Sequence, residues 1–273
     1  MAGVQELLQS DAPEKVVAQD AQRQGRVDSL TPLRIVFCNP PSPDGFVYIR
    51  DINRSGRRSR ENTVWPQTSL AMLAAVFPQH EVQIWDCIAE RLSYLDVWNQ
   101  LNEFKPDWLI LESVSATISH DAIVGLYAHS LGTKTILISP HGKALSQETH
   151  SRFPFFTHVL DYGQQIEGEP EYVIRELITG ESRQPHEIFE TLPPARQDLL
   201  PMQKYDLPLI GRGYTFVITS RGCPFRCIYC RTTVTWESKV RYRSVESIVE
   251  EIRRYHLTNI AFHADTATVN RKQ

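Results

Sequence analysis

The sequence predicts an α/β protein in which a doubly wound parallel sheet comes first and a second, shorter series of strands and helices follows. Between residues 33 and 179, five short apolar runs alternate with helical stretches, which is the pattern of strands and crossover helices in a parallel sheet. A proline-rich stretch without periodicity then separates this series from a new apolar run, residues 214–218, which leads into three closely spaced cysteines.

The composition is that of a globular protein with a sizeable core. The chain has 273 residues, of which 41% are hydrophobic and 22% are charged, and its formal net charge is -3. It shows no basic stripe, so we expect no nucleic-acid partner. No apolar run approaches the roughly 18 to 20 residues that span a bilayer, and the N-terminus lacks the apolar segment of a signal peptide. We therefore expect a cytoplasmic protein without a membrane span.

The first elements are a polar N-terminal segment and a buried strand. Residues 1–30 contain two weakly helical stretches and are assigned no function. A strand is predicted over residues 33–38, and Asn39-Pro40-Pro41 ends it because proline cannot donate to a strand ladder. The arginine-rich residues 44–62 are predicted to form a long surface loop.

From Trp65 onward, helices and strands alternate with short links. Helices are predicted over residues 66–77, 94–104, 120–130 and 171–179. Strands are predicted over residues 81–86, 108–112, 133–139 and 157–161. Ligands of doubly wound sheets bind outside the carboxyl ends of the strands. Asp86 and Ser113, which end the second strand and follow the third, are therefore candidate contacts for such a ligand.

The remaining residues divide into a linker and a second domain. We predict a doubly wound domain over residues 31–180, a proline-rich linker over 181–210 and the second domain over 211–273. That domain should contain a strand at 214–218, a helix at 245–255 with Ser244 as N-cap, and a strand at 259–262. About one and a half βα units cannot close a barrel or cover both faces of a parallel sheet.

The cysteine loop, residues 219–230, predicts a metal site. Cys223, Cys227 and Cys230 have the spacing CxxxCxxC and follow an apolar strand and a glycine-containing turn. Zinc would need a fourth ligand, such as His256 or His263. An iron–sulfur cluster is also held by thiolates, and three ligands on a cubane leave one iron open to a small molecule.

Residues 220–230, with the sequence SRGCPFRCIYC, resemble the cluster loop of the radical S-adenosylmethionine (SAM) superfamily. The resemblance implies that the three cysteines hold a 4Fe-4S cluster, that its open iron binds S-adenosyl-L-methionine, and that the chain begins a partial (β/α) barrel. It also implies an electron donor such as flavodoxin or ferredoxin, reductive cleavage to a 5'-deoxyadenosyl radical, and a place for Tyr229 near the adenine. The segment VRYRS at residues 240–244 is similar to the family as well.

The preceding domain resembles the cobalamin-binding domain of the cobalamin-dependent radical SAM enzymes. The similar features are NPP at residues 39–41, GEPE at residues 168–171 and the proline-rich linker. The resemblance implies cobalamin as a further cofactor and a small-molecule substrate that undergoes methyl transfer or a related carbon-bond reaction. The residues placed to contact these cofactors are Tyr229, Asp265, Asp86, Ser113, His141 and Glu169.

Three segments depart from the family pattern. Residues 86–91, DCIAER, lack the histidine and glycine of the DxHxxG motif that supplies an axial ligand to cobalamin. The loop at residues 139–142, SPHG, has lost two glycines, and His141 is also compatible with an ordinary polar loop. After the last strand, Asp265 keeps one acidic position where the family often has a pair.

The sequence supports more than one function. The leading hypothesis is the N-terminal part of a cobalamin-binding-domain radical SAM enzyme, whose catalytic residues are not assigned. Because most of a barrel is absent from these 273 residues, a non-catalytic cofactor-binding or regulatory module is the alternative. A zinc-binding protein is a third interpretation of the cysteines.

Overall fold

The structure is a computed structural model, and the unit described below is Leu33–Gln273. The described residues are 31–51, 54–139, 143–161, 168–230, 232–236, 238–267 and 269. The weak helices predicted within residues 1–30 lie outside this described part. Among the helices that are described, none combines the length and the apolar character needed to cross a bilayer.

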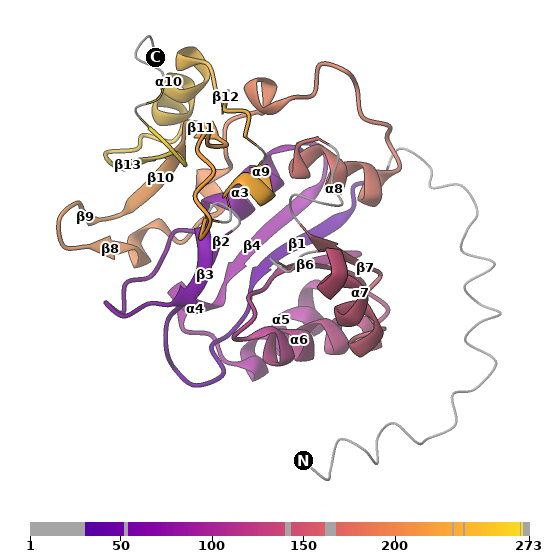
Figure 1. The fold of residues 1–273 in the computed structure, drawn as a ribbon. Helices are drawn as coiled ribbons and strands as arrows, with labels where there is room; N and C mark the ends of the chain where they lie inside the picture. Colours follow the sequence, from indigo (N-terminus) through magenta and orange to yellow (C-terminus); the bar gives the residue numbers. More distant parts are fainter. Residues whose placement is uncertain are drawn as a thin grey trace. The chain divides into compact units, whose positions relative to one another are not determined.

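A five-stranded parallel sheet forms the centre of the Leu33–Gln273 unit (Figure 1). From one edge to the other its strands are β4 (Glu81–Asp86), β1 (Arg34–Asn39), β5 (Trp108–Glu112), β6 (Lys134–Ser139) and β7 (His158–Asp161). This order confirms the predicted doubly wound fold class. The chain leaves β1 on one side for β4 and returns on the other side to β5, so the direction of winding reverses between β1 and β5.

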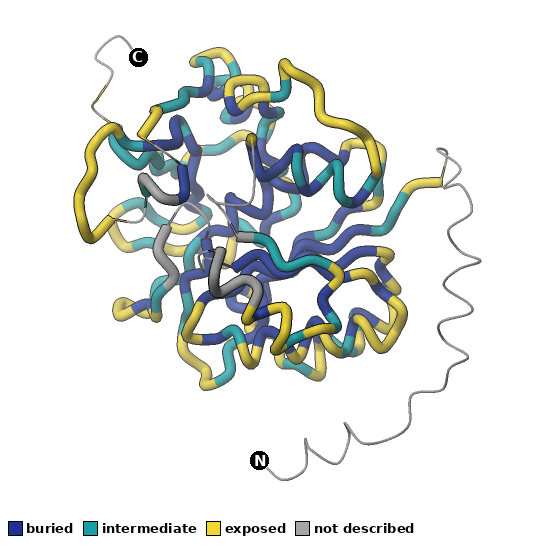
Figure 2. The backbone as a smooth tube through the Cα atoms, turned by 45° about the vertical axis from the view of Figure 1, so that its right-hand side comes forward, coloured by how far each residue is buried: buried dark blue, intermediate teal, exposed yellow. Residues whose placement is uncertain are grey.

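Both faces of the sheet are covered by helices. Along β1, Ile35 and Phe37 belong to one hydrophobic cluster and Val36 and Cys38 to the other, as expected for side chains that alternate across a strand. The first cluster includes side chains of α3 (Thr68–Ala75) and α8 (Pro170–Thr179), and the second includes those of α5 (Tyr94–Phe104) and α6 (Ile118–Ser130). Figure 2 shows these strands buried along most of their length. Because helices cover both faces, a ligand can reach this sheet only at its edges.

The prediction of a long surface loop over residues 44–62 is wrong. This segment contains an antiparallel hairpin of β2 (Tyr48–Asp51) and β3 (Arg54–Arg58). Arg50 on β2 is 0% exposed and Asp51 is 5% exposed. An arginine-rich segment is usually solvated, but a guanidinium can be buried when acidic and carbonyl partners surround it. Those partners are distant in sequence, so the local pattern could not show them.

The predicted helices and strands of the first domain are present, with small differences in their bounds. Two helices were not predicted: α4 (Cys87–Glu90) directly after β4, and α7 (Lys143–Arg152) before β7. The sequence of α7, KALSQETHSR, is mostly polar and shows no helical repeat of apolar residues. The Ser93 N-cap of α5 forms a capping box with Asp96, which fixes the start of that helix one residue after the cap.

The segment between α8 and β10 has no long helix or strand, as its prolines predict. It contains the short 3₁₀ turns η1 (Phe189–Thr191), η2 (Gln197–Leu199) and η3 (Met202–Lys204) and the small hairpin of β8 (Asp206–Leu207) and β9 (Gly211–Arg212). Its buried side chains include Phe189, Leu192 and Tyr205, which join the first hydrophobic cluster of the sheet. The segment therefore packs on the hydrophobic cluster through these side chains, while the domain boundaries at 181 and 210 stay predictions.

The C-terminal residues form the strand, helix and strand that the sequence predicts. The strands β10 (Tyr214–Ile218) and β13 (Asn259–His263) pair in parallel, and α10 (Val245–Arg254) lies between them in sequence. Ser244 caps α10 by accepting a hydrogen bond from the Ser247 N–H at 3.1 Å, which confirms the predicted N-cap. A short antiparallel pair, β11 (Ser220–Arg221) and β12 (Arg241–Tyr242), and the helix α9 (Thr232–Trp236) complete this part.

Candidate functional site

The cysteine loop projects from the end of β10 with its thiols toward the surface. Cys223 is half-buried, whereas Cys227 and Cys230 are exposed. Tyr229 is 89% exposed and Ile228 is fully exposed. The Cys230 N–H donates to the Cys227 carbonyl at 3.0 Å, which bends the CxxC segment into a turn. Buried cysteines normally act as small apolar core residues, so exposed thiols on a turn are placed for binding rather than packing.

Asp265, just after β13, holds the loop at two points. Its Oδ2 accepts a hydrogen bond from the Gly222 N–H at 2.8 Å, and its Oδ1 accepts one from Thr232 Oγ1 at 3.2 Å. The neighbouring Thr266 Oγ1 lies 2.8 Å from Cys223 Sγ. The sequence predicts Asp265 as a cofactor contact, and the carboxylate in this structure braces the cysteine loop instead. The cofactor contact stays a prediction.

Gly222 meets a backbone requirement at the entrance to the loop. Its φ is +94°, and a Cβ built at this position would lie 2.3 Å from the Lys239 carbonyl oxygen. Only glycine adopts this φ readily while allowing so close an approach. The glycine thus sets the direction in which the chain enters the cysteine loop.

A buried network of charges lies directly before the first cysteine. Arg221 donates to Glu169 at 2.9 Å and to both oxygens of Glu171, at 2.5 and 2.9 Å. Glu169 also accepts from Arg241 Nε at 2.7 Å. Arg221 and Glu171 have side chains that are 0% exposed. We call these four residues the arginine–glutamate network, and it ties the cysteine loop to the N-terminus of α8.

Two sets of charges beside the cysteine loop have partners that the local sequence does not show. Arg241 and its neighbour Arg243 are more typical of a solvated basic surface by sequence alone, yet Arg243 is 1% exposed and pairs with Glu251 at 2.7 Å. Glu169, a candidate cofactor contact, is the N-cap residue of α8, but its side chain makes no cap hydrogen bond and pairs with arginines. In this structure Glu169 is part of the support of the cysteine loop.

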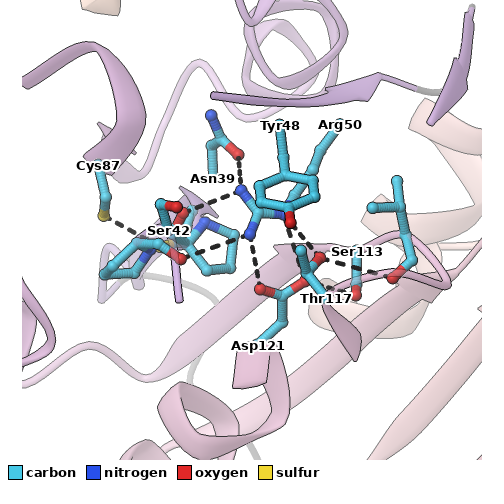
Figure 3. A network of polar contacts seen from close by, with 12 residues as sticks. Asn39, Ser42, Tyr48, Arg50, Cys87, Ser113, Thr117 and Asp121 are labelled. Atoms are coloured by element: carbon cyan, nitrogen blue, oxygen red, sulfur yellow. Dashed lines mark hydrogen bonds and ion pairs between the residues drawn. The ribbon is translucent and has the colours of Figure 1, made fainter. Parts of the chain in front are cut away.

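Arg50 occupies the carboxyl edge of the sheet between β1 and β5, where the winding reverses (Figure 3). Its guanidinium donates to Asn39 Oδ1 at 3.1 Å and to the Pro40 carbonyl at 3.0 Å, both at the end of β1. On the β5 side it forms an ion pair with Asp121 of α6 at 2.8 Å. A crevice at this reversal is the usual ligand site of doubly wound sheets. Here a side chain of the protein fills it.

Ser113, predicted as a sheet-ligand contact, belongs to the same buried cluster. Its hydroxyl donates to Asp121 Oδ2 at 2.6 Å, and the Thr117 hydroxyl donates to the same oxygen at 2.6 Å. Burial raises the pKa of Asp121, and Arg50 opposes that shift. The Ser113 side chain therefore stabilises the carboxylate of the Arg50–Asp121 pair by a hydrogen bond, and its contact with a ligand stays a prediction.

Asp86, the third candidate at the carboxyl edge, is fully buried at the end of β4. It accepts hydrogen bonds from Asn39 Nδ2 at 2.7 Å, from the Ala89 N–H at 3.1 Å and from the Tyr205 hydroxyl at 2.8 Å. Burial raises its pKa from 3.8 to about 6, although these three donors act in the opposite direction. Asp86 thus joins β1, α4 and the segment before β10. His141 lies outside the described residues, so its predicted contact is untested.

The raised pKa of Asp86 predicts a pH-dependent free energy of unfolding. Because the folded pKa is above the unfolded one, the folded state retains this proton between pH 3.8 and about 6, and stability falls as pH rises through that window. Between pH 4.5 and 7 the expected loss from this group is about 2 kcal/mol. Urea unfolding at both pH values measures it. The Asp86→Asn variant, which cannot titrate, should lose that part of the pH dependence, and an equal slope in both proteins would contradict the assignment.

An open cavity lies beside the carboxyl end of β4. Its volume is about 850 Å³, within the range of small-molecule sites. It is lined by Cys87 to Ser93, by the loop after β1 and by Lys204, Asp206 and Arg212. The cavity is therefore offset from the filled reversal point toward the outer strand β4.

Comparison with known families identifies the cysteine loop and the strands around it. The family model described as the radical SAM superfamily matches residues 217–273. Over this segment the chain is similar to the radical SAM superfamily. The match includes all three cysteines, α9, α10 and β13.

Two curated methyltransferases are similar to the chain. An uncharacterized methyltransferase of Pyrococcus horikoshii is 27% identical over 242 residues, which cover 77% of this chain and 51% of that protein. The cytidylyl-2-hydroxyethylphosphonate methyltransferase of Streptomyces wedmorensis is 50% identical over 45 residues, 16% of this chain and 8% of that protein. The chain therefore spans about half the length of the first of these methyltransferases and a small part of the second.

Solved structures show the same fold over most of the chain. TsrM from Kitasatospora setae, a radical SAM methyltransferase solved with tryptophan substrate and a SAM analogue, matches with a TM-score of 0.55 and 12% identity over 88% of this chain and 49% of its own. The cobalamin-dependent radical SAM enzyme OxsB matches with a TM-score of 0.56 and 14% identity over 86% of this chain and 34% of its own. At these identities the likeness establishes the architecture of a doubly wound sheet before a radical SAM segment.

The donor atoms of the radical SAM loop fit an iron–sulfur cluster in chemistry and exposure. Three thiols lie on one braced loop, and two of them are not used in packing. Within the described part of the chain, however, no group of three His, Cys, Asp or Glu residues is close enough to hold a metal ion. The assignment of Cys223, Cys227 and Cys230 as ligands therefore stays a prediction.

Cobalamin fits less well at the reversal point of the sheet. Arg50 fills the crevice between β1 and β5. In the segment after β4, the buried Ile88 stands at the position where the DxHxxG motif has histidine. The described residues of this edge thus provide neither an axial histidine nor an open crevice there. Among the described residues, an open cavity lies beside β4.

Sequence reasoning missed the residues that act through long-range contacts. Thr266 and Asp121 are ordinary residues in their local sequence, and their partners lie 43 and 71 positions away. The sequence around Arg50 contains one signal that could have indicated the hairpin. Two short runs of residues, each long enough for a hairpin strand, lie around Arg50 in an arginine-rich stretch. No pattern within the chain pointed to its partner.

Proposed function

We propose that the chain is the N-terminal part of a radical SAM enzyme with a methyltransferase-like activity. The observation that carries the proposal is the exposed CxxxCxxC loop, held in place by Asp265 and Thr266 within a segment that matches the radical SAM superfamily. Cys223, Cys227 and Cys230 would hold a 4Fe-4S cluster. When bound, that cluster would supply an electron for the reductive cleavage of S-adenosyl-L-methionine.

The residues of the chain have supporting roles in this proposal. Gly222 sets the entry of the loop, Asp265 holds one residue before the cysteines and one after them, and Tyr229 presents an aromatic face beside the last cysteine. An aromatic ring in such a position can stack on an adenine. The similarity to methyltransferases supports transfer of a one-carbon group to a small-molecule substrate. The substrate itself is left open.

The proposal includes an electron donor and a cellular compartment. A cluster of this class needs a low-potential donor such as flavodoxin or ferredoxin. Exposed Cys227 and Cys230 keep their thiolates in a reducing compartment, which supports the cytoplasm. Cobalamin remains an optional cofactor of the doubly wound domain, residues 31–180, and no step is assigned to it because the reversal point does not fit a ligand.

Cluster assembly tests the proposal directly. Anaerobic reconstitution with iron and sulfide should give about four irons per chain and the absorption of a cubane cluster. The Cys227→Ala variant should lose most of this iron, because two thiolates cannot hold the cluster. Cys38→Ala, which removes a fully buried cysteine outside the loop, is the matched control and should keep it. Full iron content in Cys227→Ala, or stoichiometric zinc in the wild-type protein, would contradict the ligand assignment.

One observation favours the alternative of a non-catalytic module. In the described residues, β13 pairs only with β10, and Phe262 on β13 is 65% exposed. Mixing the reconstituted protein with S-adenosyl-L-methionine and a reductant separates the two functions. Release of 5'-deoxyadenosine supports the enzyme, and its absence from a protein with a full cluster supports the module.

A further inference from the structure

The arginine–glutamate network lies in an unusual position for four buried or partly buried charges. Arg221 is two residues before Cys223, a separation that extended chain covers in at most about 7 Å. Its partners Glu169 and Glu171 belong to the start of α8, which follows β7 at the carboxyl edge of the sheet. The network therefore joins the ligand edge of the first domain to the first cysteine of the loop.

The two terminal nitrogens of Arg221 and the faces of its guanidinium are held by contacts. Glu171 binds it through two hydrogen bonds and Glu169 through a third. The rings of Phe189 and Trp236 lie with their centroids 4.8 and 4.6 Å from the guanidinium carbon. Trp236 is the last residue of α9, which follows the cysteine loop. The Arg221 side chain thus connects the start of the cysteine loop with the end of the helix that follows it.

The charges of the network balance. Two arginines and two glutamates give no net charge, and three of the four side chains are at most 5% exposed. Charges in a buried position interact over longer distances than charges in water, because solvent screens them less. Loss of one member would leave a net charge beside the thiolates.

We propose that Arg221, Glu169, Glu171 and Arg241 position the cysteine loop and set the reduction potential of the cluster bound there. The inference rests on the proposed function, since it presumes that the loop holds a cluster. Reduction adds one electron to the cluster. A net positive charge nearby favours the reduced state, and a net negative charge favours the oxidised state.

The sign and size of the effect follow from the missing charge. Glu171→Gln leaves the network with a net positive charge, so the reduction potential should rise. A unit charge about 10 Å away, at an effective dielectric constant of about 20, changes such an equilibrium roughly tenfold. For a one-electron couple, tenfold corresponds to about 59 mV. Glu169→Gln, which removes the same charge from the partner of both arginines, should raise the potential in the same direction.

The experiment is a potentiometric titration of the reconstituted protein, followed by electron paramagnetic resonance. Arg221→Lys keeps the charge and should leave the potential close to that of the wild type. Glu176→Gln on α8, whose partner is the partly exposed Arg183, is the matched control for loss of a glutamate and should have no effect. A lower melting temperature with an unchanged potential in both Glu169→Gln and Glu171→Gln would show that the network is only structural.

The outcomes separate this inference from the proposed function. If the wild-type protein binds no cluster, the proposed function fails and the inference fails with it. If the wild-type cluster forms but neither glutamine variant shifts the potential upward, only the inference is overturned. If Glu171→Gln does not fold, Glu169→Gln decides the question, because its carboxylate contacts Arg221 through a single hydrogen bond.

Discussion

Replacing Arg50 by alanine is expected to lower the free energy of unfolding by about 3–5 kcal/mol, because the change leaves Asp121 buried without its cation. Arg50 and Asp121 both have side chains that are 0% exposed, and they are joined at 2.8 Å. The variant also removes the donors to Asn39 and to the Pro40 carbonyl at the end of β1. An unsatisfied buried acceptor adds to the cost.

Urea unfolding followed by circular dichroism measures this effect. Arg57→Ala is the matched control in the same hairpin, because Arg57 has a 38% exposed side chain and pairs with the exposed Glu61. Its free energy of unfolding should change by less than about 0.5 kcal/mol. A double variant of Arg50 and Asp121 to alanine should be less destabilised than the sum of the single variants. Strict additivity would show that the two side chains do not depend on each other.

Gly222→Ala is expected to destabilise the protein by about 2–4 kcal/mol and to abolish iron uptake. The new Cβ would lie 2.3 Å from the Lys239 carbonyl oxygen, at a φ of +94° that alanine rarely adopts. Relief requires the chain to move at the residue before Cys223. That movement breaks the hydrogen bond from the Gly222 N–H to Asp265.

The control for this prediction separates the effect of a positive φ from the effect of the close contact between the new Cβ and a carbonyl oxygen. Gly132 has a similar φ of +82° and nothing within 4 Å of a built Cβ. Gly132→Ala should therefore lose only about 1 kcal/mol of unfolding free energy and should keep full iron uptake. Equal iron content in both variants after anaerobic reconstitution would mean that the contact with Lys239 does not shape the loop.

The sheet could be predicted because its information is local. Three of its strands, β1, β5 and β6, are apolar runs that are buried on both faces, and the lengths of the links limited the connections to parallel ones. The cysteine spacing likewise lies within eight residues. Both predictions needed no knowledge of which distant residues meet.

The interior polar contacts could not be predicted for the opposite reason. Ser113 and Asp86 were correctly placed at the carboxyl edge, but their side chains are engaged by Asp121 and by Asn39 with Tyr205. The sequence predicts a loop where the hairpin with Arg50 lies. The burial of Arg50 depends on Asp121, which is 71 residues away and so is not part of the local pattern. The sequence shows that burial of a charged side chain would cost free energy. It does not show which partner compensates that cost in the folded protein.

The bracing of the cysteine loop by Asp265 and Thr266 has a consequence for how the protein is made. These residues lie 43 positions after Gly222 and Cys223, so they leave the ribosome after the cysteines do. The thiols emerge first, on a segment whose two anchors do not yet exist. Domains fold in N-terminal to C-terminal order during synthesis, so the sheet can form while the loop is still unanchored. If the loop holds the proposed cluster, metal delivered at that stage would meet three cysteines on a segment that is not yet braced, and the braced loop would become available only after β13 has been made.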